Sequence, residues 1–257
     1  MGQLEGRVAL ITGAGSGIGK GIAEVFAREG AAVALAGRTV AKVEALAEAL
    51  RGEGRDAQAF EADVAKHADC ERVVTQTVER FGALHLLVNN AGVAKARPLV
   101  DTRVDEIEAM LDTDLKGPIF LTRAAIPHLQ RHKDSGGAAV LNISSSVTLT
   151  AVRSFSVYAA AKAGLDHLTR CLALELAADR IRVNAICPGV VDTPIFATMM
   201  PKAAVPKAMA SFATKHPLGR VGQPADIAAA ALYLCGPSAS WVTGVVMPVD
   251  GGISLGA

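Results

Sequence analysis

Tyr158 and Lys162 stand four residues apart in a segment with helical character, and their side chains could transfer a proton. A spacing of four places both side chains on one face of a helix. A phenol normally titrates near pH 10, which is too high for a general base at neutral pH, but a neighbouring ammonium favours the phenolate. The pair alone is a weak motif, because most such pairs lie on the surface. It becomes a candidate site only if other elements bring ligand-binding groups beside it.

A buried strand is expected just before this pair. The apolar run 138–143 predicts the strand, and Ser144, Ser145 and Ser146 follow at its carboxyl end. A serine run at this place is often only a cap for the next turn. It also puts hydroxyl groups where open α/β sheets bind ligands.

The stretch from Arg7 to Gly19 is built to hold a dinucleotide. A short apolar run ends at Thr12 and breaks into Gly13-Ala-Gly-Ser16-Gly17-Ile18-Gly19, after which apolar residues recur at helical spacing. The glycines allow a tight turn and bring backbone N–H groups close to a ligand, and the helix that follows points its positive end at the turn. Strand, glycine turn and helix in this order predict a pyrophosphate site.

Arg38 stands where a residue can discriminate between NAD(H) and NADP(H). It follows a second predicted strand, 32–36, where an acid would accept hydrogen bonds from the adenosine ribose and repel a 2′-phosphate. This chain has Gly37 and then a guanidinium, whose shape suits a phosphate. NADP(H) is therefore favoured. The alternative is a solvated arginine in a protein that accepts NAD(H).

Two further strand ends carry candidate binding residues. Strand 57–62 ends at Asp63 and Val64, where the carboxylate could also cap a helix that starts near Lys66. Strand 84–88 runs into Asn89-Asn90-Ala91-Gly92, whose small residues would let the adenine ribose approach. Asn-Asn could alternatively be turn chemistry.

Taken together, these motifs resemble those of the short-chain dehydrogenase/reductase family, in particular its 3-oxoacyl-carrier-protein reductase-like members. The segments 12–19, 89–92 and 188–193 and the set Ser145, Tyr158 and Lys162 occur in the family's order and spacing. The resemblance covers residues 4–252. It implies one α/β domain over 1–257, with a doubly wound, Rossmann-like parallel sheet of about seven strands and helices on both faces. It also implies hydride transfer between NAD(P)(H) and a carbonyl or secondary alcohol.

The resemblance assigns catalytic roles to Ser145, Tyr158, Lys162 and Asp114. Ser145 would hold the substrate oxygen, Tyr158 would donate the proton, and Lys162 would lower the tyrosine pKa and bind the nicotinamide ribose. Relatives usually carry Asn where Asp114 stands, and that Asn holds a water that links the lysine to solvent. The substitution adds a charge near the site, so the proton relay is open to question here. A dinucleotide-binding regulator without chemistry is the alternative that Asp114 supports.

The resemblance also assigns a cofactor site. Asp63 would contact the adenine amino group, Pro188 and Gly189 would lie under the nicotinamide, and Thr193 would bind its carboxamide. The full set of predicted cofactor-binding residues is Gly13, Ser16, Gly17, Ile18, Gly19, Arg38, Asp63, Val64, Asn90, Ala91, Gly92, Tyr158, Lys162, Pro188, Gly189, Val191 and Thr193.

The segment 194–217 is predicted to be an irregular, apolar substrate lid, with a buried packing loop as the alternative. Together with Val147 and Phe155 it favours a hydrophobic ketone or 3-oxoacyl compound as substrate. An acyl carrier protein is one candidate partner, because the basic run 131–133 could meet an acidic surface. The alternative for this run is a solvated helix end.

Composition narrows the remaining classes. Lys and Arg number 26 against 25 acids, so no nucleic-acid or anionic-membrane partner is indicated. Four scattered cysteines predict unpaired thiols in a reducing compartment, and no metal site is expected. No apolar run is long enough to span a membrane, which favours a cytoplasmic protein. The resemblance implies a homotetramer.

Overall fold

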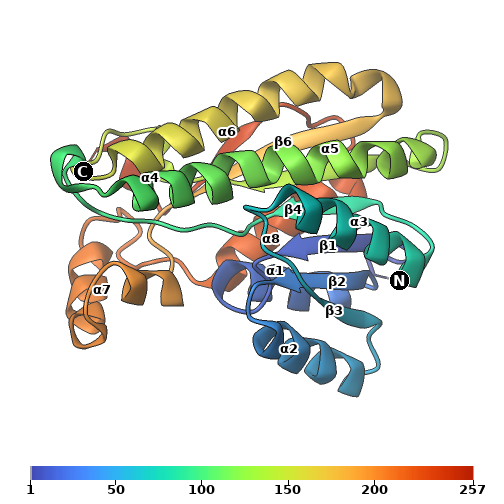
Figure 1. The fold of residues 1–257 in the computed structure, drawn as a ribbon, viewed down its shortest axis with the longest axis horizontal. Helices are drawn as coiled ribbons and strands as arrows, with labels where there is room; N and C mark the ends of the chain where they lie inside the picture. The colour runs from blue at the N-terminus through green and yellow to red at the C-terminus, as the bar shows by residue number, and fades with distance from the viewer. Residues whose placement is uncertain (1, 257) are drawn as a thin grey trace.

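One parallel sheet organises the chain in the computed structural model, which describes residues 2–256 (Figure 1). Seven strands lie in the order β3-β2-β1-β4-β5-β6-β7. Their bounds are β1 (Val8–Thr12), β2 (Ala32–Gly37), β3 (Ala57–Glu61), β4 (Leu86–Asn89), β5 (Ala138–Ile143), β6 (Ile181–Pro188) and β7 (Val246–Val249). Strand order reverses beside β1, so β1 and β4 flank the point where ligands bind in such sheets. The predicted fold class is confirmed.

Helices cover both faces of the sheet. The helices of the described residues are α1 (Gly17–Arg28), α2 (Val40–Gly52), α3 (His67–Phe81), α4 (Val104–Leu111), α5 (Gly117–Leu129), α6 (Ser156–Glu175), α7 (Val205–Ala213), which lies away from the sheet (Figure 1), and α8 (Pro224–Cys235). Side chains of α1, α2 and α8 form one buried apolar cluster with the sheet, and those of α3, α5 and α6 form the other. Buried on both faces, the central strands are continuous apolar runs, as parallel sheets require.

The helical pattern from Asp101 to Arg131 predicts a break or bend around Gly117-Pro118. The structure has a π-helical turn just before these residues, η2 (Asp112–Lys116), between α4 and α5. Pro118 occupies the first turn of α5, where its missing N–H costs no hydrogen bond. Asp114 is buried within the π turn.

Two expectations from the sequence need correction. The segment 194–217 is not irregular throughout, because it contains the 3₁₀ turns η6 (Pro194–Thr198) and η7 (Lys202–Ala204) and the helix α7. Asp63 does not cap α3. That helix starts at His67 after Lys66, and Asp63 instead accepts a hydrogen bond from the Ala65 N–H at 3.2 Å.

The four cysteines are unpaired thiols, as predicted. No helix among the described residues is long and apolar enough to cross a bilayer. Within residues 2–256, no group of three or more His, Cys, Asp or Glu side chains is placed to hold a metal ion.

At the amino ends of the strands, His85 is held in its neutral form. Its Nδ1 accepts a hydrogen bond from the Val8 N–H at 3.0 Å, and its ring stacks on His132 with centroids 3.8 Å apart. Burial, followed by the nearby charges of His132 and Arg7, lowers the pKa of His85 to about 4. In the unfolded chain His85 is protonated below its ordinary pKa of 6.5, whereas in the folded chain it is protonated only below about pH 4.

We expect this difference in the pKa of His85 between the folded and unfolded chain to make the fold less stable in acid. Between pH 7 and pH 5 the His85 contribution should lower the free energy of unfolding by about 2 kcal/mol. Urea unfolding of wild type and His85→Gln at both pH values measures it, and the variant should lose less stability on acidification. His167→Gln, at an exposed position on α6, is the matched control. An equal acid loss in wild type and His85→Gln would contradict the prediction.

Candidate active site

The candidate residues meet at the carboxyl edge of the sheet. Gly13 follows β1, Arg38 follows β2, Asn90 follows β4, Ser145 follows β5, and β6 ends at Pro188. In parallel strands all these ends lie on one edge, so residues far apart in the chain face a common space. The structure thus brings the predicted residues to one side of the molecule.

Thr12 and Asn90 join the first two of these ends. The Thr12 hydroxyl accepts hydrogen bonds from the N–H groups of Asn90 and Ala91, both at 3.1 Å. The Asn90 amide in turn donates to the Thr12 carbonyl at 2.8 Å. Asn89 points the other way and binds Asn142 and Thr122 in the interior. Asn90 therefore supports the glycine turn, and Asn89 anchors β4 to β5.

The glycine turn has no room for side chains at three of its positions. A Cβ on Gly19 would lie 2.3 Å from the Asn90 amide nitrogen, and one on Gly13 would lie 2.9 Å from the Ala91 Cα. Gly17 adopts a left-handed conformation with φ of 54° beside the Thr193 methyl. The Ser16 side chain does not cap α1, so the first backbone N–H groups of this helix, that of Ile18 included, are open to a ligand. This bare cradle fits a pyrophosphate at a helix N-terminus.

The two ends of the predicted cofactor site are also in place. Arg38 is exposed beyond β2, and Asp63 and buried Val64 follow β3. At the other end, Gly189 packs on the Asp250 backbone, where a Cβ would lie 2.8 Å from the carbonyl oxygen. Val191 is buried and pairs with the strand-like Gly222, which holds the loop that carries Thr193.

Lys42 is a candidate that the sequence analysis missed. Its Cβ lies 2.9 Å from the position that a Cβ on Gly15 would take, so the first turn of α2 borders the glycine turn. Within residues 2–256, neither the Arg38 nor the Lys42 side chain makes a hydrogen bond or an ion pair, and both are exposed. Its spacing of four from Arg38 was the available signal.

Tyr158 and Ser145 face each other across the mouth of the site. Tyr158 lies in the first turn of α6 and is half-buried, and the Ser145 hydroxyl is within hydrogen-bonding reach of its phenol. The neighbouring serines have other tasks. Ser144 is buried and donates to the Lys162 carbonyl, and Ser146 starts a 3₁₀ turn. Of the three, Ser145 is the hydroxyl placed beside the tyrosine.

Lys162 is buried and held by two partners. Its Nζ donates to the Ile143 carbonyl at 2.9 Å and forms an ion pair with Asp114 Oδ1 at 3.1 Å. The ammonium lies 5.8 Å from the centre of the Tyr158 ring. Asp114 Oδ2 accepts a further hydrogen bond from the Val93 N–H at 3.3 Å. Asp114 thus contacts the lysine directly.

The electrostatics of this group differ from the expectation. Burial raises the pKa of Tyr158, Lys162 acts in the predicted opposite direction, and Asp114 raises it again, so the net direction is upward. Burial opposes the charge on Lys162, but Asp114 and Tyr158 outweigh it and raise the lysine pKa. Burial also raises the pKa of Asp114 against the attraction of Lys162. Lys162 thus favours the phenolate as predicted, but burial outweighs this effect and the pKa of Tyr158 lies above its ordinary value.

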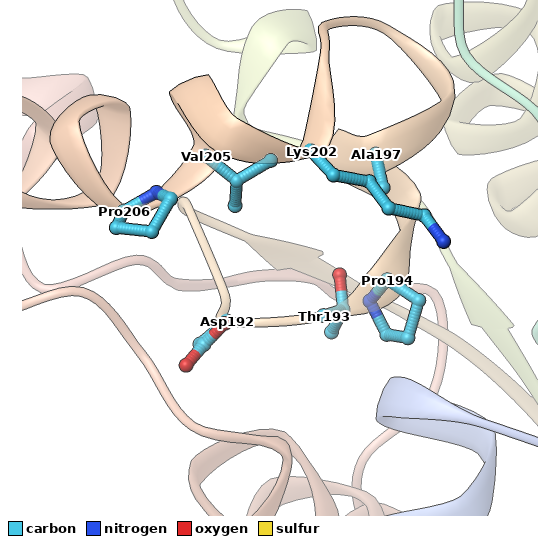
Figure 2. Close-up of a pocket in the computed structure, with 7 residues that line it drawn as sticks. All are labelled: Asp192, Thr193, Pro194, Ala197, Lys202, Val205 and Pro206. Carbon is cyan, nitrogen blue, oxygen red and sulfur yellow. The ribbon is translucent and has the colours of Figure 1, made fainter.

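A cavity of about 420 Å³ lies between the Thr193 loop and the segment 194–217. Figure 2 shows Asp192 and Thr193 on one side and Val205, Lys202 and Ala197 on the other. The same segment packs internally through Phe196 and Phe212, whose ring centroids are 5.9 Å apart. The segment therefore lies beside Thr193 and forms one wall of this cavity.

Comparison with known proteins agrees with this geometry. A family model described as enoyl-(acyl carrier protein) reductase matches residues 13–254. The chain belongs to the short-chain dehydrogenase/reductase family. It is accordingly an NAD(P)-dependent dehydrogenase/reductase with the Rossmann-like sheet described above.

Relatives within the short-chain dehydrogenase/reductases span several activities. A 3-oxoacyl-[acyl-carrier-protein] reductase of Thermotoga maritima is 34% identical, with 98% of this chain and 100% of the relative covered. A 3β-hydroxysteroid dehydrogenase of Eggerthella lenta is 37% identical over 98% of this chain and 95% of its own. The crystal structure of 3-ketoacyl-(acyl-carrier-protein) reductase from Brucella melitensis, complexed with NADH, has a TM-score of 0.90 at 37% identity, covering 98% and 99%.

Proposed function

We propose that this enzyme transfers a hydride reversibly between NADP(H) and a carbonyl or secondary alcohol, with a hydrophobic ketone or 3-oxoacyl compound as substrate. The observation that carries the proposal is the placement of Tyr158, Ser145 and Lys162 at the same sheet edge as the glycine cradle. A proton donor and a hydride donor then face one carbonyl. Membership of the short-chain dehydrogenase/reductase family supports this chemistry.

Each side chain has a distinct task in the reduction. When bound, the nicotinamide supplies the hydride to the carbonyl carbon. Ser145 holds the carbonyl oxygen by a hydrogen bond that strengthens as negative charge develops. Tyr158 donates its proton to that oxygen. Lys162, fixed by Ile143 and Asp114, presents its ammonium toward the phenol and would bind the nicotinamide ribose.

The preference for NADP(H) rests on two cations. Arg38 and Lys42 border the adenosine end of the cradle, and the end of β2 offers Gly37 where an acid would reject a 2′-phosphate. NAD(H) is the alternative, and the NADH complex of the Brucella melitensis reductase favours it.

The proposed substrate is apolar because of what surrounds the catalytic group. Val147, Phe155 and the segment 194–217 contribute apolar side chains, and Met199 and Met200 are half-buried there. We propose that this segment is the substrate lid of a single domain. The related 3-oxoacyl reductase and hydroxysteroid dehydrogenase support thioesters and fused-ring alcohols as the two classes to test first.

We also propose a cytoplasmic homotetramer with no nucleic-acid or membrane partner, and an acyl carrier protein as an alternative carrier of the substrate. Exposed apolar side chains support assembly. Trp241 is 99% exposed, Val100 is 91% exposed and Leu174 is 82% exposed in the single chain. Covering such residues is a common use of subunit interfaces.

The experiment that tests the function is NADPH consumption with a short 3-oxoacyl thioester. A panel of cyclic ketones and steroid alcohols is run in parallel, and NADH replaces NADPH as the comparison. Turnover with either class supports hydride transfer and identifies the substrate class. A protein that binds cofactor but turns over no member of either class would contradict the proposal and favour a regulator.

Arg38→Ala tests the cofactor preference. We expect the variant to bind NADPH about 10- to 100-fold more weakly, because a charged hydrogen bond to phosphate contributes about 1.5–3 kcal/mol. NADH binding should change little. Fluorescence titration of both cofactors measures the difference, and Arg51→Ala, at the far end of α2, is the matched control. Equal losses for the two cofactors would make Arg38 a bystander.

A further inference from the structure

We propose that Asp114 is a positioning residue that offsets the charge of Lys162 and so keeps Tyr158 a neutral phenol up to alkaline pH. The inference rests on the proposed function and adds the direction in which the reaction is favoured near neutral pH. With a protonated tyrosine, the enzyme is set for carbonyl reduction near neutral pH. Alcohol oxidation needs the phenolate and therefore requires alkaline conditions.

The first support is the closeness and burial of the pair. Asp114 is 0% exposed and Lys162 is 4% exposed, and their charged atoms are 3.1 Å apart. Two opposite charges at this distance and away from water largely cancel at a third group beside them. Tyr158 thus meets a neutralised lysine and not a free ammonium.

The second support is the tight packing around the carboxylate. A Cβ on Gly92 would lie 2.7 Å from Asp114 Oδ1 and 3.7 Å from Lys162 Nζ. The Val93 N–H holds the other oxygen. Asp114 lies within the π turn and is fully buried, so its carboxylate has protein on all sides. The contact is a fixed part of the site.

The other charged groups near the tyrosine do not replace this effect. Ser145 donates or accepts a hydrogen bond and carries no charge, and Cys187 on β6 disfavours the phenolate. On α6, Asp166 adds to the negative surroundings of Lys162. On α4, the buried Glu106 is paired with Arg97 at 3.7 Å. Strand β5 and the turn 146–148 have no ionisable side chain. Lys162 is therefore the cation that favours the phenolate, and Asp114 opposes it.

An amide at this position would act differently. Asn has nearly the shape of Asp and could keep a hydrogen bond with Lys162, but it brings no negative charge. Lys162 would then attract the phenolate without compensation. An uncompensated cation near an acid lowers its pKa by about one to three units. Asp114→Asn should therefore release the tyrosine proton at lower pH.

The two tyrosines of the chain make this measurable without substrate. Only Tyr158 and Tyr233 are present, so the ultraviolet absorbance of phenolate, minus that of Tyr158→Phe, follows Tyr158 alone. The titration is run on the full chain as wild type and as Asp114→Asn, the latter with its own Tyr158→Phe partner. Asp112→Asn is the matched control, since Asp112 lies in the same π turn but pairs with the exposed Lys116 at 2.7 Å.

We expect Tyr158 to titrate at or above the ordinary value of about 10 in wild type and in Asp112→Asn. In Asp114→Asn it should titrate at least about one unit lower. In turnover, the falling alkaline limb of reduction and the rising limb of oxidation should move to lower pH by the same amount.

An unchanged titration in folded Asp114→Asn would overturn the proposal, as would a wild-type value well below 10. A wild-type value well below 10 overturns it even where the variant does not fold. Because the titration needs no turnover, a shifted titration in a protein without activity would overturn the proposed function and leave the role of Asp114 supported. Turnover with an unshifted titration would have the opposite meaning.

Discussion

Tyr158→Phe should lower turnover by about 10²- to 10⁴-fold or more, the usual contribution of a general acid. The phenyl ring keeps the packing of the first turn of α6 and removes only the hydroxyl beside Ser145. Cofactor affinity should stay within a few-fold of wild type, because the glycine cradle and its Asn90 support are untouched. Steady-state turnover and cofactor titration on the same preparation measure the two effects.

The control for this change is Tyr233→Phe, which removes a phenol from the exposed face of α8. It should leave both turnover and cofactor binding unaltered. Substantial turnover in Tyr158→Phe would show that another group supplies the proton. A matching loss of cofactor affinity would place the hydroxyl in binding and not in proton transfer.

Lys162→Met should lower the free energy of unfolding by about 3–5 kcal/mol in addition to removing activity. The methionine fills a similar volume, but it leaves the carboxylate of Asp114 buried without its partner and the Ile143 carbonyl without its donor. A charge left alone in the interior is costly. Urea unfolding monitored by circular dichroism measures the loss.

The double variant Lys162→Met with Asp114→Leu tests that explanation. Removing both charges replaces the pair by apolar groups of similar size, which is often neutral for stability. Most of the lost stability should therefore return, while activity stays absent. If the double variant is as unstable as the sum of the two single changes, the buried ion pair is not the origin of the loss.

Most of the fold could be predicted from local sequence patterns. Apolar runs such as 138–143 predict strands because a parallel strand is buried on both faces, and β5 has these bounds. The glycine turn could be predicted for a similar reason. Close approach to Asn90 and a left-handed backbone both favour glycine, so the glycines mark the turn in the sequence. The helix 205–213 was missed because Pro206 was taken as a sign of irregular structure, although it simply stands in the first turn of the helix, where proline is tolerated.

The candidate site divides in a similar way. Tyr158 and Lys162 share a face by helical spacing alone, and Arg38 could be assigned from its place after β2. Lys42 was not assigned, because its approach to Gly15 depends on how α2 packs against the glycine turn. For Asp63 the sequence left a helix cap open beside an adenine contact, and in the structure its carboxylate accepts from the Ala65 N–H instead of capping α3.

By itself the sequence determined the family, the parallel sheet and the edge at which the chemistry gathers, because each follows from short motifs whose geometry is local. Only the tertiary structure decided what Asp114 does. The π turn carries its carboxylate beneath Gly92 and against Lys162, and no spacing along the chain encodes that meeting. The charge around a buried phenol is the sum of contacts from several elements, so its direction emerges only when those elements are packed together.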